Sequence, residues 1–482
     1  MSADSTSEFE VVIGLEVHAQ LLTDSKIFAR SSTVSGKTAN TLTDPVTLGL
    51  PGSLPVLNKR SVDFAIRLGL ALQCSIERTS IFARKHYLYP DLPKGYQISQ
   101  YDKPICLNGS LVVRIKDGTK KIGITRIHLE EDAGKNTHLS DEPYSLVDLN
   151  RAGVPLLEIV SEPDMRSPEE AGAYMRQLRQ VLLYLDICDG NMEEGSLRCD
   201  ANVSIRRRGE TKLGTKVEVK NLNSFRFVER ALEYEIERQI AAVREGTPIV
   251  QETRLWDEAA CTTLPMRSKE HAEDYRYFPD PDLLPLVVDD DWIARTKSSL
   301  PELPAQVYER FRKSYELDPY YCEILAEEKA VARYYDEAVA FHNNPIAIAN
   351  WITTELFGRL NKESMAMSSN PISPENLASL ILLVDNKTIS GKMAKAIFDE
   401  MFSTGSSPRD IIEAQGLKQI SDPAELEALV DSILSQSAAQ LQAYRDGKTK
   451  MFGYFVGQVM KASDGKANPQ IVNELLERKL KA

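Results

Sequence analysis

Polar and apolar residues alternate along several short segments of the first 297 residues, which predicts strands with one buried face and one polar face. Residues 197–205 show the pattern most clearly, and their polar set is Arg198, Asp200, Asn202 and Ser204. Residues 215–220 repeat it, with Lys216, Glu218 and Lys220 on the polar side. A polar face with charges of both signs is suited to a polar ligand, and cross-strand ion pairs in solvent would produce the same pattern.

Apolar residues recur at helical spacing in two places among these strands and continuously after residue 300. One helix is predicted to begin at Ser167, because a proline and two acids follow this serine. A second helix is predicted over 224–242. The proline-rich segment Leu300–Pro304 marks the change to continuous helices, and Gly405–Pro408 is typical of a linker. We therefore expect three parts, a strand-rich part at 1–297 and helical parts at 298–407 and 408–482.

Glu158 lies in the otherwise apolar segment 154–160. An ionised carboxylate in such a place needs a partner, because its removal from water is costly. The segment 127–132 supplies further acids, and strict alternation puts Glu131 on the apolar side with Ile127 and Leu129. Glu131 is therefore predicted to share the apolar side of its strand, as Glu158 is.

Glu16 and His18 are two residues apart, so they lie on one face of a strand if this segment is extended. Together with the two acids on apolar faces they have the composition of a carboxylate-rich cation site. Oxygen ligands favour Mg²⁺, Ca²⁺ or Mn²⁺, and a histidine shifts the preference slightly towards Mn²⁺ or Zn²⁺. Of these ions we expect Mg²⁺. A buried ion-pair network with Arg126 or Arg151 would explain the same acids without a metal ion.

Standard nucleotide-binding motifs are absent from the sequence. Gly36-Lys-Thr38 and Gly447-Lys-Thr449 both lack the earlier glycine of a phosphate-binding loop. A bound nucleotide would therefore need metal and side chains, and the candidate arginines, which are equally explained as surface residues, are Arg254, Arg267 and Arg276. The segment Lys94–Asp102 is dense in hydrogen-bonding side chains, which suits a substrate-lining loop or a plain surface loop.

Composition narrows the class of protein. The chain has 482 residues, 42% of them hydrophobic and 27% charged, with a formal net charge of −12. No apolar stretch is long enough to span a membrane, the start resembles neither a signal nor a transit peptide, and the six cysteines are scattered. We expect a cytoplasmic protein without disulfides. From Arg445 onward the chain has eight basic residues and four acids. This local excess of positive charge suits either binding of nucleic acid or a solvated helical surface.

Several motifs, taken together and in this order, resemble the B subunit of the glutamyl/aspartyl-tRNA amidotransferases over essentially the whole chain. The motifs are Val12–His18, His86–Asp91, Val147–Glu162, Lys220–Phe225, Asp274–Pro279, Phe455–Lys461 and Gly465–Pro469.

The resemblance implies a ligase of three subunits that converts Glu-tRNA(Gln), Asp-tRNA(Asn) or both into the amidated forms. The A subunit, an amidase, would release ammonia from glutamine, and the small C subunit would strap the other two together. The B subunit would activate the tRNA-bound carboxylate with ATP as an acyl phosphate, which ammonia then attacks. The sequence does not distinguish the two tRNA substrates, or one metal ion from two.

Matched position by position, the family's Mg²⁺ ligands correspond to Glu16, His18, Glu131 and Glu158, with Asp200 as a further ligand. Glu131 and Glu158 are accordingly expected to be catalytic. Lys216 and Lys220 are expected to stabilise developing charge or to guide ammonia. Glu130 and Glu218 are additional candidates.

The resemblance also implies an α+β fold, in which a cradle-shaped, mostly antiparallel sheet domain precedes a helical domain and a small helical tail that touches tRNA. The chain departs from the family at one point. Many members carry a zinc knuckle near the start, whereas Phe28–Ser31 and Asp44–Gly49 contain no cysteine here. We therefore expect no structural zinc.

Two other classes of protein fit parts of the sequence. One is a stand-alone metal-dependent kinase or ligase for a small carboxylate, which would not need the helical basic tail. The other is a tRNA-binding scaffold whose acids only hold the sheet together, which would not need acids on apolar faces.

Overall fold

The computed structural model describes residues 8–139, 142–266, 275–415, 422–445, 448–463 and 466–481. The chain forms two compact units, Met1–Leu303 and Pro304–Ala482. The division falls inside the proline-rich segment Leu300–Pro304 that the sequence singled out, before its last proline, and residue 297 itself lies inside helix α4 (Asp290–Ser298).

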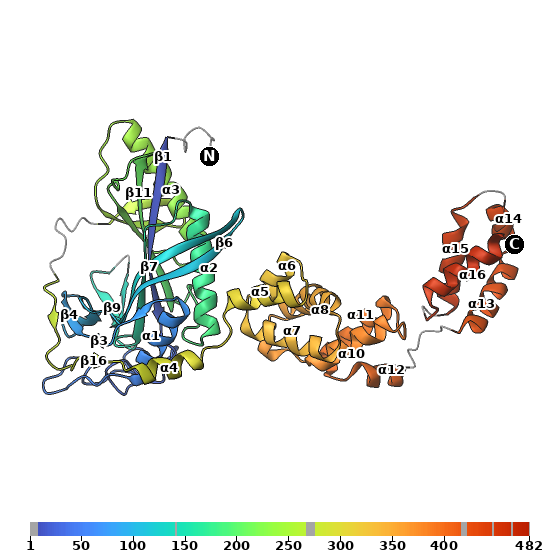
Figure 1. Ribbon diagram of the computed structural model, residues 1–482, viewed down its shortest axis with the longest axis horizontal. Coiled ribbons are helices and arrows are strands. Elements are labelled where there is room, and N and C mark those ends of the chain that lie inside the picture. The colour runs from blue at the N-terminus through green and yellow to red at the C-terminus, as the bar shows by residue number, and fades with distance from the viewer. Residues whose placement is uncertain are drawn as a thin grey trace. The chain divides into compact units, whose positions relative to one another are not determined.

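A nine-stranded sheet forms the centre of the first unit (Figure 1). Its strand order is β14-β13-β12-β11-β1-β10-β7-β6-β2, in which β12 and β13 are parallel and the other neighbours are antiparallel. The strands are β1 (Phe9–Gln20), β2 (Ser75–Ile76), β6 (Cys106–Ile115), β7 (Gly118–Glu131), β10 (Pro155–Ser161), β11 (Leu197–Arg207), β12 (Val217–Lys220), β13 (Thr253–Asp257) and β14 (Thr262–Pro265).

Smaller sheets flank this one. The first joins β15 (Phe278–Pro279), β4 (Phe82–His86) and β5 (Tyr96–Gln100), and β5 contacts β7 of the large sheet. Two further pairs are β3 (Thr79–Ser80) with β16 (Leu286–Val287), and β8 (Lys135–His138) with β9 (Ser145–Asp148).

Helices α1 (Lys59–Ala71), α2 (Pro168–Tyr184) and α3 (Phe225–Arg244) pack against the large sheet (Figure 1). They bury the apolar members of each alternating strand in one core, including Leu129, Leu157 and Ala201. Both helices predicted among the strands are confirmed. Ser167 and Ser224 cap α2 and α3, because each hydroxyl accepts a hydrogen bond from the backbone three residues on.

The named secondary-structure elements among the described residues of the second unit are all helices. Its first group of helices comprises α5 (Pro304–Ser314), α6 (Pro319–Leu325), α7 (Lys329–Phe341), α8 (Pro345–Trp351), a π-helical turn (Ile352–Leu356), α9 (Phe357–Lys362), a 3₁₀ turn (Met367–Ser369), α10 (Pro374–Asp385), α11 (Gly391–Thr404) and α12 (Pro408–Gln415). The last group has its own apolar core and comprises α13 (Pro423–Gln436), α14 (Ala438–Arg445), α15 (Met451–Ala462) and α16 (Pro469–Lys481).

The α+β class, with a sheet unit followed by helices, is confirmed. The expected division near residue 408 falls at the start of helix α12. This helix packs on α10 and α11, which precede it in the first helical group. That domain boundary stays a prediction. Among the described residues, no helix has both the length and the apolar character that a transmembrane span requires.

Candidate metal centre

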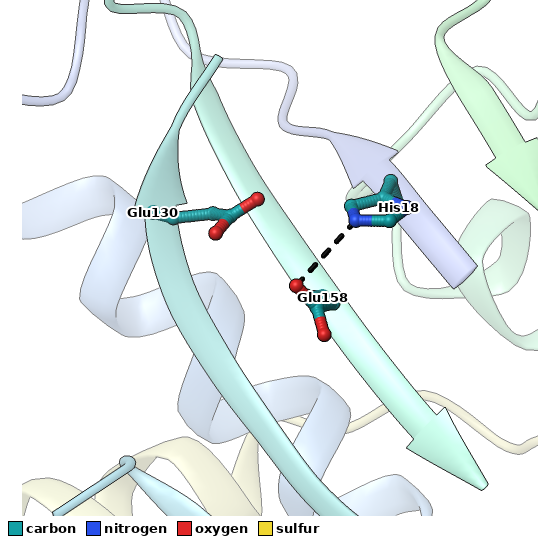
Figure 2. Close-up of side chains that lie close together, drawn as sticks. All are labelled: His18, Glu130 and Glu158. Carbon is teal, nitrogen blue, oxygen red and sulfur yellow. Dashed lines mark ion pairs between the residues drawn. The ribbon is translucent and has the colours of Figure 1, made fainter. Parts of the chain in front are cut away.

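Two histidines and two glutamates from β1, β7 and β10 meet on the polar face of the large sheet. His18 lies opposite Glu158 in the register of β1 and β10, and Glu158 lies opposite His128 in that of β10 and β7. The Nε2 atoms of His18 and His128 are each 3.4 Å from Glu158 Oε2, and His128 Nε2 is 3.6 Å from Glu130 Oε2. Figure 2 shows Glu130 and His18 pointing towards Glu158 from the strands on either side.

Glu158 reaches this group because its strand alternates. Leu157 and Ile159 are fully buried in the core, so Glu158 projects to the opposite face. The prediction that Glu158 lies on the apolar side of its strand is therefore wrong. Its carboxylate is still only 12% exposed, and the partners that the sequence required are two histidines across the strands and, at 3.8 Å from Oε1, the guanidinium of Arg126.

The charges in this group depend on one another. Burial alone would lower the pKa of His128, but the negative charges of Glu158 and Glu130 raise it to about 9. The pKa of His18 is also raised, since its interaction with Glu158 outweighs burial. Burial alone would raise the pKa of Glu158, but His128 and His18 hold it well below its usual value. Without a metal ion His128 is therefore protonated at neutral pH, and both histidines are held towards the charged form that compensates the carboxylates.

Glu16 and Asp200 begin a second acidic group on the same face. Glu16 lies opposite Asp200 in the register of β1 and β11, and its Oε1 accepts a hydrogen bond of 3.0 Å from the Asn202 amide. Burial and the nearby charges of Glu158, Glu218 and Asp200 raise the pKa of Glu16.

Lys220 is the cation of this second group. Its Nζ lies 2.5 Å from Asp200 Oδ2 and 3.1 Å from Glu218 Oε1. Burial alone would lower the pKa of Lys220, but Asp200 and Glu218 raise it. Lys216, the other predicted lysine, is exposed just before β12.

Glu131 points away from the histidines. Its parity with Ile127 and Leu129 follows the prediction, because β7 places His128 and Glu130 on the other face. Glu131 Oε1 forms an ion pair with Lys94 and accepts a 2.8 Å hydrogen bond from the backbone N–H of Ile98. The structure thus brings Glu130, rather than Glu131, to His18 and Glu158. The expected roles of Glu131 as a metal ligand and a catalytic residue stay predictions, and they compete with the assignment of Glu130 to this group.

Strand β5 supports both glutamates of β7. Most of the predicted substrate loop 94–102 lies in or beside this strand. The Ser99 hydroxyl donates a hydrogen bond of 3.2 Å to Glu130, and the Gln97 amide donates one of 2.7 Å to the Glu131 carbonyl.

The candidate nucleotide-binding arginines lie elsewhere. Arg254 is buried, and its guanidinium donates to the hydroxyl and carbonyl of Thr263 and to Glu252 at 2.6 to 2.7 Å. Arg276 has a left-handed backbone (φ 44°), and its carbonyl lies 3.2 Å from His86 Nδ1. Arg267 falls outside the described residues. Contact of these arginines with a nucleotide stays a prediction.

A hydrogen bond joins Phe28–Ser31 to Asp44–Gly49, the two segments that stand where many family members carry a zinc knuckle. Asp44 accepts hydrogen bonds from the Ser31 hydroxyl, from Thr47 Oγ1 at 2.9 Å, and from the backbone N–H groups of Val46 and Thr47 at 2.9 and 3.0 Å. Burial alone would raise the pKa of Asp44, but these hydrogen bonds and Lys26 lower it.

The residues of the first group fit a divalent cation. His18, Glu130 and Glu158 offer ligand atoms that all lie within 4.8 Å of one another. Two are carboxylate oxygens, which suit Mg²⁺, and the imidazole also suits Mn²⁺ or Zn²⁺. His128 lies beside this donor set, and across the described part of the chain its Nδ1 is among the buried polar atoms without a hydrogen-bond partner.

Local sequence identified His18 and Glu158 but undervalued Glu130 and missed His128. The alternation in 127–132 placed His128 and Glu130 on one face, and this pattern could have marked both as members of the site. What it did not contain is the register of β7 against β10 and β1, which brings that face to Glu158 and His18.

The chain matches known proteins over nearly its whole length. Residues 11–294 match the family model described as the GatB/GatE catalytic domain, and residues 333–480 match that of the GatB domain. Relatives named as the B subunit of the aspartyl/glutamyl-tRNA(Asn/Gln) amidotransferase include that of Geotalea uraniireducens, 54% identical over 98% of this chain and 99% of the relative. That of Bdellovibrio bacteriovorus is 52% identical over 99% of this chain and 100% of the relative. The chain therefore belongs to the family of B subunits of the aspartyl/glutamyl-tRNA amidotransferases, a family of ligase subunits, as its motifs predicted.

Proposed function

We propose that this chain activates and amidates the side-chain carboxylate of misacylated Glu-tRNA(Gln), Asp-tRNA(Asn) or both, within a complex that also holds a glutaminase, the A subunit, plus the small C subunit. In the first step a carboxylate oxygen attacks the γ-phosphorus of ATP, and ADP leaves. In the second step ammonia attacks the acyl carbon, the phosphate leaves with the bonding electrons, and the nitrogen loses a proton. The glutaminase supplies the ammonia from glutamine.

The observation that carries this proposal is the His18–Glu130–Glu158 donor set on the polar face of the large sheet. A carboxylate and ATP are both anionic, so bringing them together requires positive charge. A divalent cation, when bound, neutralises charge on phosphate oxygens. His18, Glu130 and Glu158 would hold it.

The second acidic group has a positioning role in this proposal. Glu16 and Asp200 add negative charge beside the donor set and would orient or complete the cation site. Lys220 is held by Asp200 and Glu218, so its ammonium has a fixed place on this face of the sheet. There it would stabilise the charge that develops on the transferring phosphoryl group.

The helices of residues 422–482 would contact the tRNA. The basic excess after Arg445 supports this role, although Arg478 and Lys479 pair with Glu427 and Asp431. Phosphate contacts make such binding sensitive to salt. Deletion of residues 422–482 from the assembled complex is expected to raise the Kd for tRNA, and an unchanged Kd would contradict this role. A cytoplasmic location, where charged tRNA and ATP are available, belongs to the same proposal.

The test is ATP-dependent amidation of Glu-tRNA(Gln) and Asp-tRNA(Asn) by the chain purified with the A and C subunits. Glu158→Gln is expected to abolish amidation and tRNA-dependent ATP hydrolysis while glutamine hydrolysis by the glutaminase persists. The matched control is Glu10→Gln, since Glu10 lies at the other end of β1 and pairs with Arg206. A wild-type complex that folds but does not amidate either tRNA would refute the proposal. Normal amidation by Glu158→Gln would favour the scaffold alternative, in which the histidines and acids only hold the sheet together.

A further inference from the structure

An aromatic stack lies beside the metal centre and has no part in the roles assigned above. Tyr101 follows β5 directly and Tyr277 precedes β15, the strands on either side of β4. Their rings are parallel within 5°, and their centroids are 4.1 Å apart. The ring of Tyr275 meets Tyr277 edge-on, at 6.0 Å and 71°.

The stack has one open end. Tyr277 covers one face of Tyr101, yet Tyr101 remains 56% exposed. An exposed aromatic ring with a rigid second ring behind it offers a flat, pre-positioned surface. Such surfaces bind nucleobases, because every base has a π face that stacks on an aromatic side chain.

The stack lies within reach of the donor set. Ser99, which donates a hydrogen bond to Glu130, is two residues before Tyr101. Two residues of fully extended chain span about 7 Å, so the backbone of Tyr101 is at most about 7 Å from that of Ser99. The charges of Glu130 and Glu158 also act on Tyr277, where they and burial raise the pKa of its hydroxyl.

We propose that Tyr101, backed by Tyr277, is a stacking platform for the adenine ring of a substrate of the metal centre. This inference rests on the proposed function, which brings two adenines to the site. One belongs to ATP, and the other is the 3′-terminal base of tRNA, whose ribose carries the reacting amino acid. In both molecules the base is joined through its ribose to the group that must lie at the donor set, so the platform serves one of them.

The test measures KM for ATP and KM for the charged tRNA separately, in the complete complex with the A and C subunits. Tyr101→Ala is expected to raise one of the two KM values by about 5- to 150-fold, the range of single-base stacking. Tyr101→Phe keeps the ring and is expected to stay within about twofold of wild type in both. The control is Tyr144→Ala, because Tyr144 is equally exposed, at 55%, and lies in the loop before β9.

The pattern of the result identifies the source of the adenine. A higher KM for ATP alone assigns the platform to ATP, and a higher KM for charged tRNA alone assigns it to the terminal adenosine. Unchanged KM values for Tyr101→Ala in an active complex would overturn the inference while leaving the proposed function intact. A fall in kcat alone, or equal losses in Tyr101→Ala and Tyr101→Phe, would overturn it as well. If Tyr101→Ala fails to assemble, Tyr101→Leu removes the ring while keeping an apolar side chain, and the same outcomes apply.

Discussion

Replacing Lys26 by methionine is expected to stabilise the first unit, although it removes a hydrogen bond. Lys26 is fully buried, and its Nζ donates to the Leu42 carbonyl at 2.7 Å. Burial lowers the pKa of Lys26 from 10.5 to about 8, despite the charges of Asp44, Glu131 and Asp148. At about 1.4 kcal/mol per unit, the buried charge costs about 3 kcal/mol at neutral pH.

The loss of the hydrogen bond opposes this gain. An unsatisfied Leu42 carbonyl costs about 1 to 2 kcal/mol, so Lys26→Met is expected to raise the free energy of unfolding by about 1 to 2 kcal/mol at pH 7. Between pH 8 and 10.5 the unfolded chain binds more protons at Lys26 than the folded chain does. The wild type should therefore gain stability through this window, and the advantage of Lys26→Met should shrink and then reverse.

Urea unfolding of the full chain, followed by tryptophan fluorescence at about pH 7 and about pH 10, measures the stability difference at neutral pH and its change in alkali. These two values span most of the window in which Lys26 titrates. The control is Lys121→Met, an exposed position on β7 that is expected to change stability by less than about 0.5 kcal/mol. A Lys26→Met variant that is less stable at neutral pH, with the same difference from wild type in alkali, would refute the reasoning.

Two further predictions concern the surroundings of Lys26. Asp44→Ala should lower the free energy of unfolding by about 2 to 4 kcal/mol, since Ser31 and Thr47 lose their acceptor, and thermal unfolding with and without added Zn²⁺ should show no rescue by zinc. Because the pKa of Asp44 is lowered, its contribution is present above about pH 4 and lost as the pH falls below that value, so the variant and wild type should converge in acid. Glu131→Gln should cost about 3 to 5 kcal/mol, because Lys94 is left charged and buried, and a denaturation curve within about 1 kcal/mol of wild type would contradict this.

Much of the fold follows from local patterns. The alternation in 197–205 gave the polar face of β11, and the Ser167 and Ser224 caps gave the starts of α2 and α3. These features depend on residues close in sequence, so the chain displays them directly. The placement of Glu16 and His18 on one strand face has the same origin.

The composition of the site depends on contacts that are distant in sequence. Glu158 joins His18 and His128 only through the register of three strands. Glu131 turns to Lys94 because β5 packs against the end of β7, and Arg254 is buried because β13 pairs with β14 beside Glu235. A single strand pattern shows which face a side chain occupies, and tertiary packing decides what it meets there.

Divalent-cation binding by Glu130→Gln and Glu131→Gln tests the central claim most directly, because these neighbours lie on opposite faces of β7. Titration calorimetry of the complete complex with Mg²⁺ or Mn²⁺ gives the affinity, and amidation is measured on the same samples. The donor set of His18, Glu130 and Glu158 predicts that Glu130→Gln weakens binding about tenfold or more, whereas Glu131→Gln binds the cation as wild type does. Cation binding that survives Glu130→Gln and is lost in Glu131→Gln would contradict the assignment.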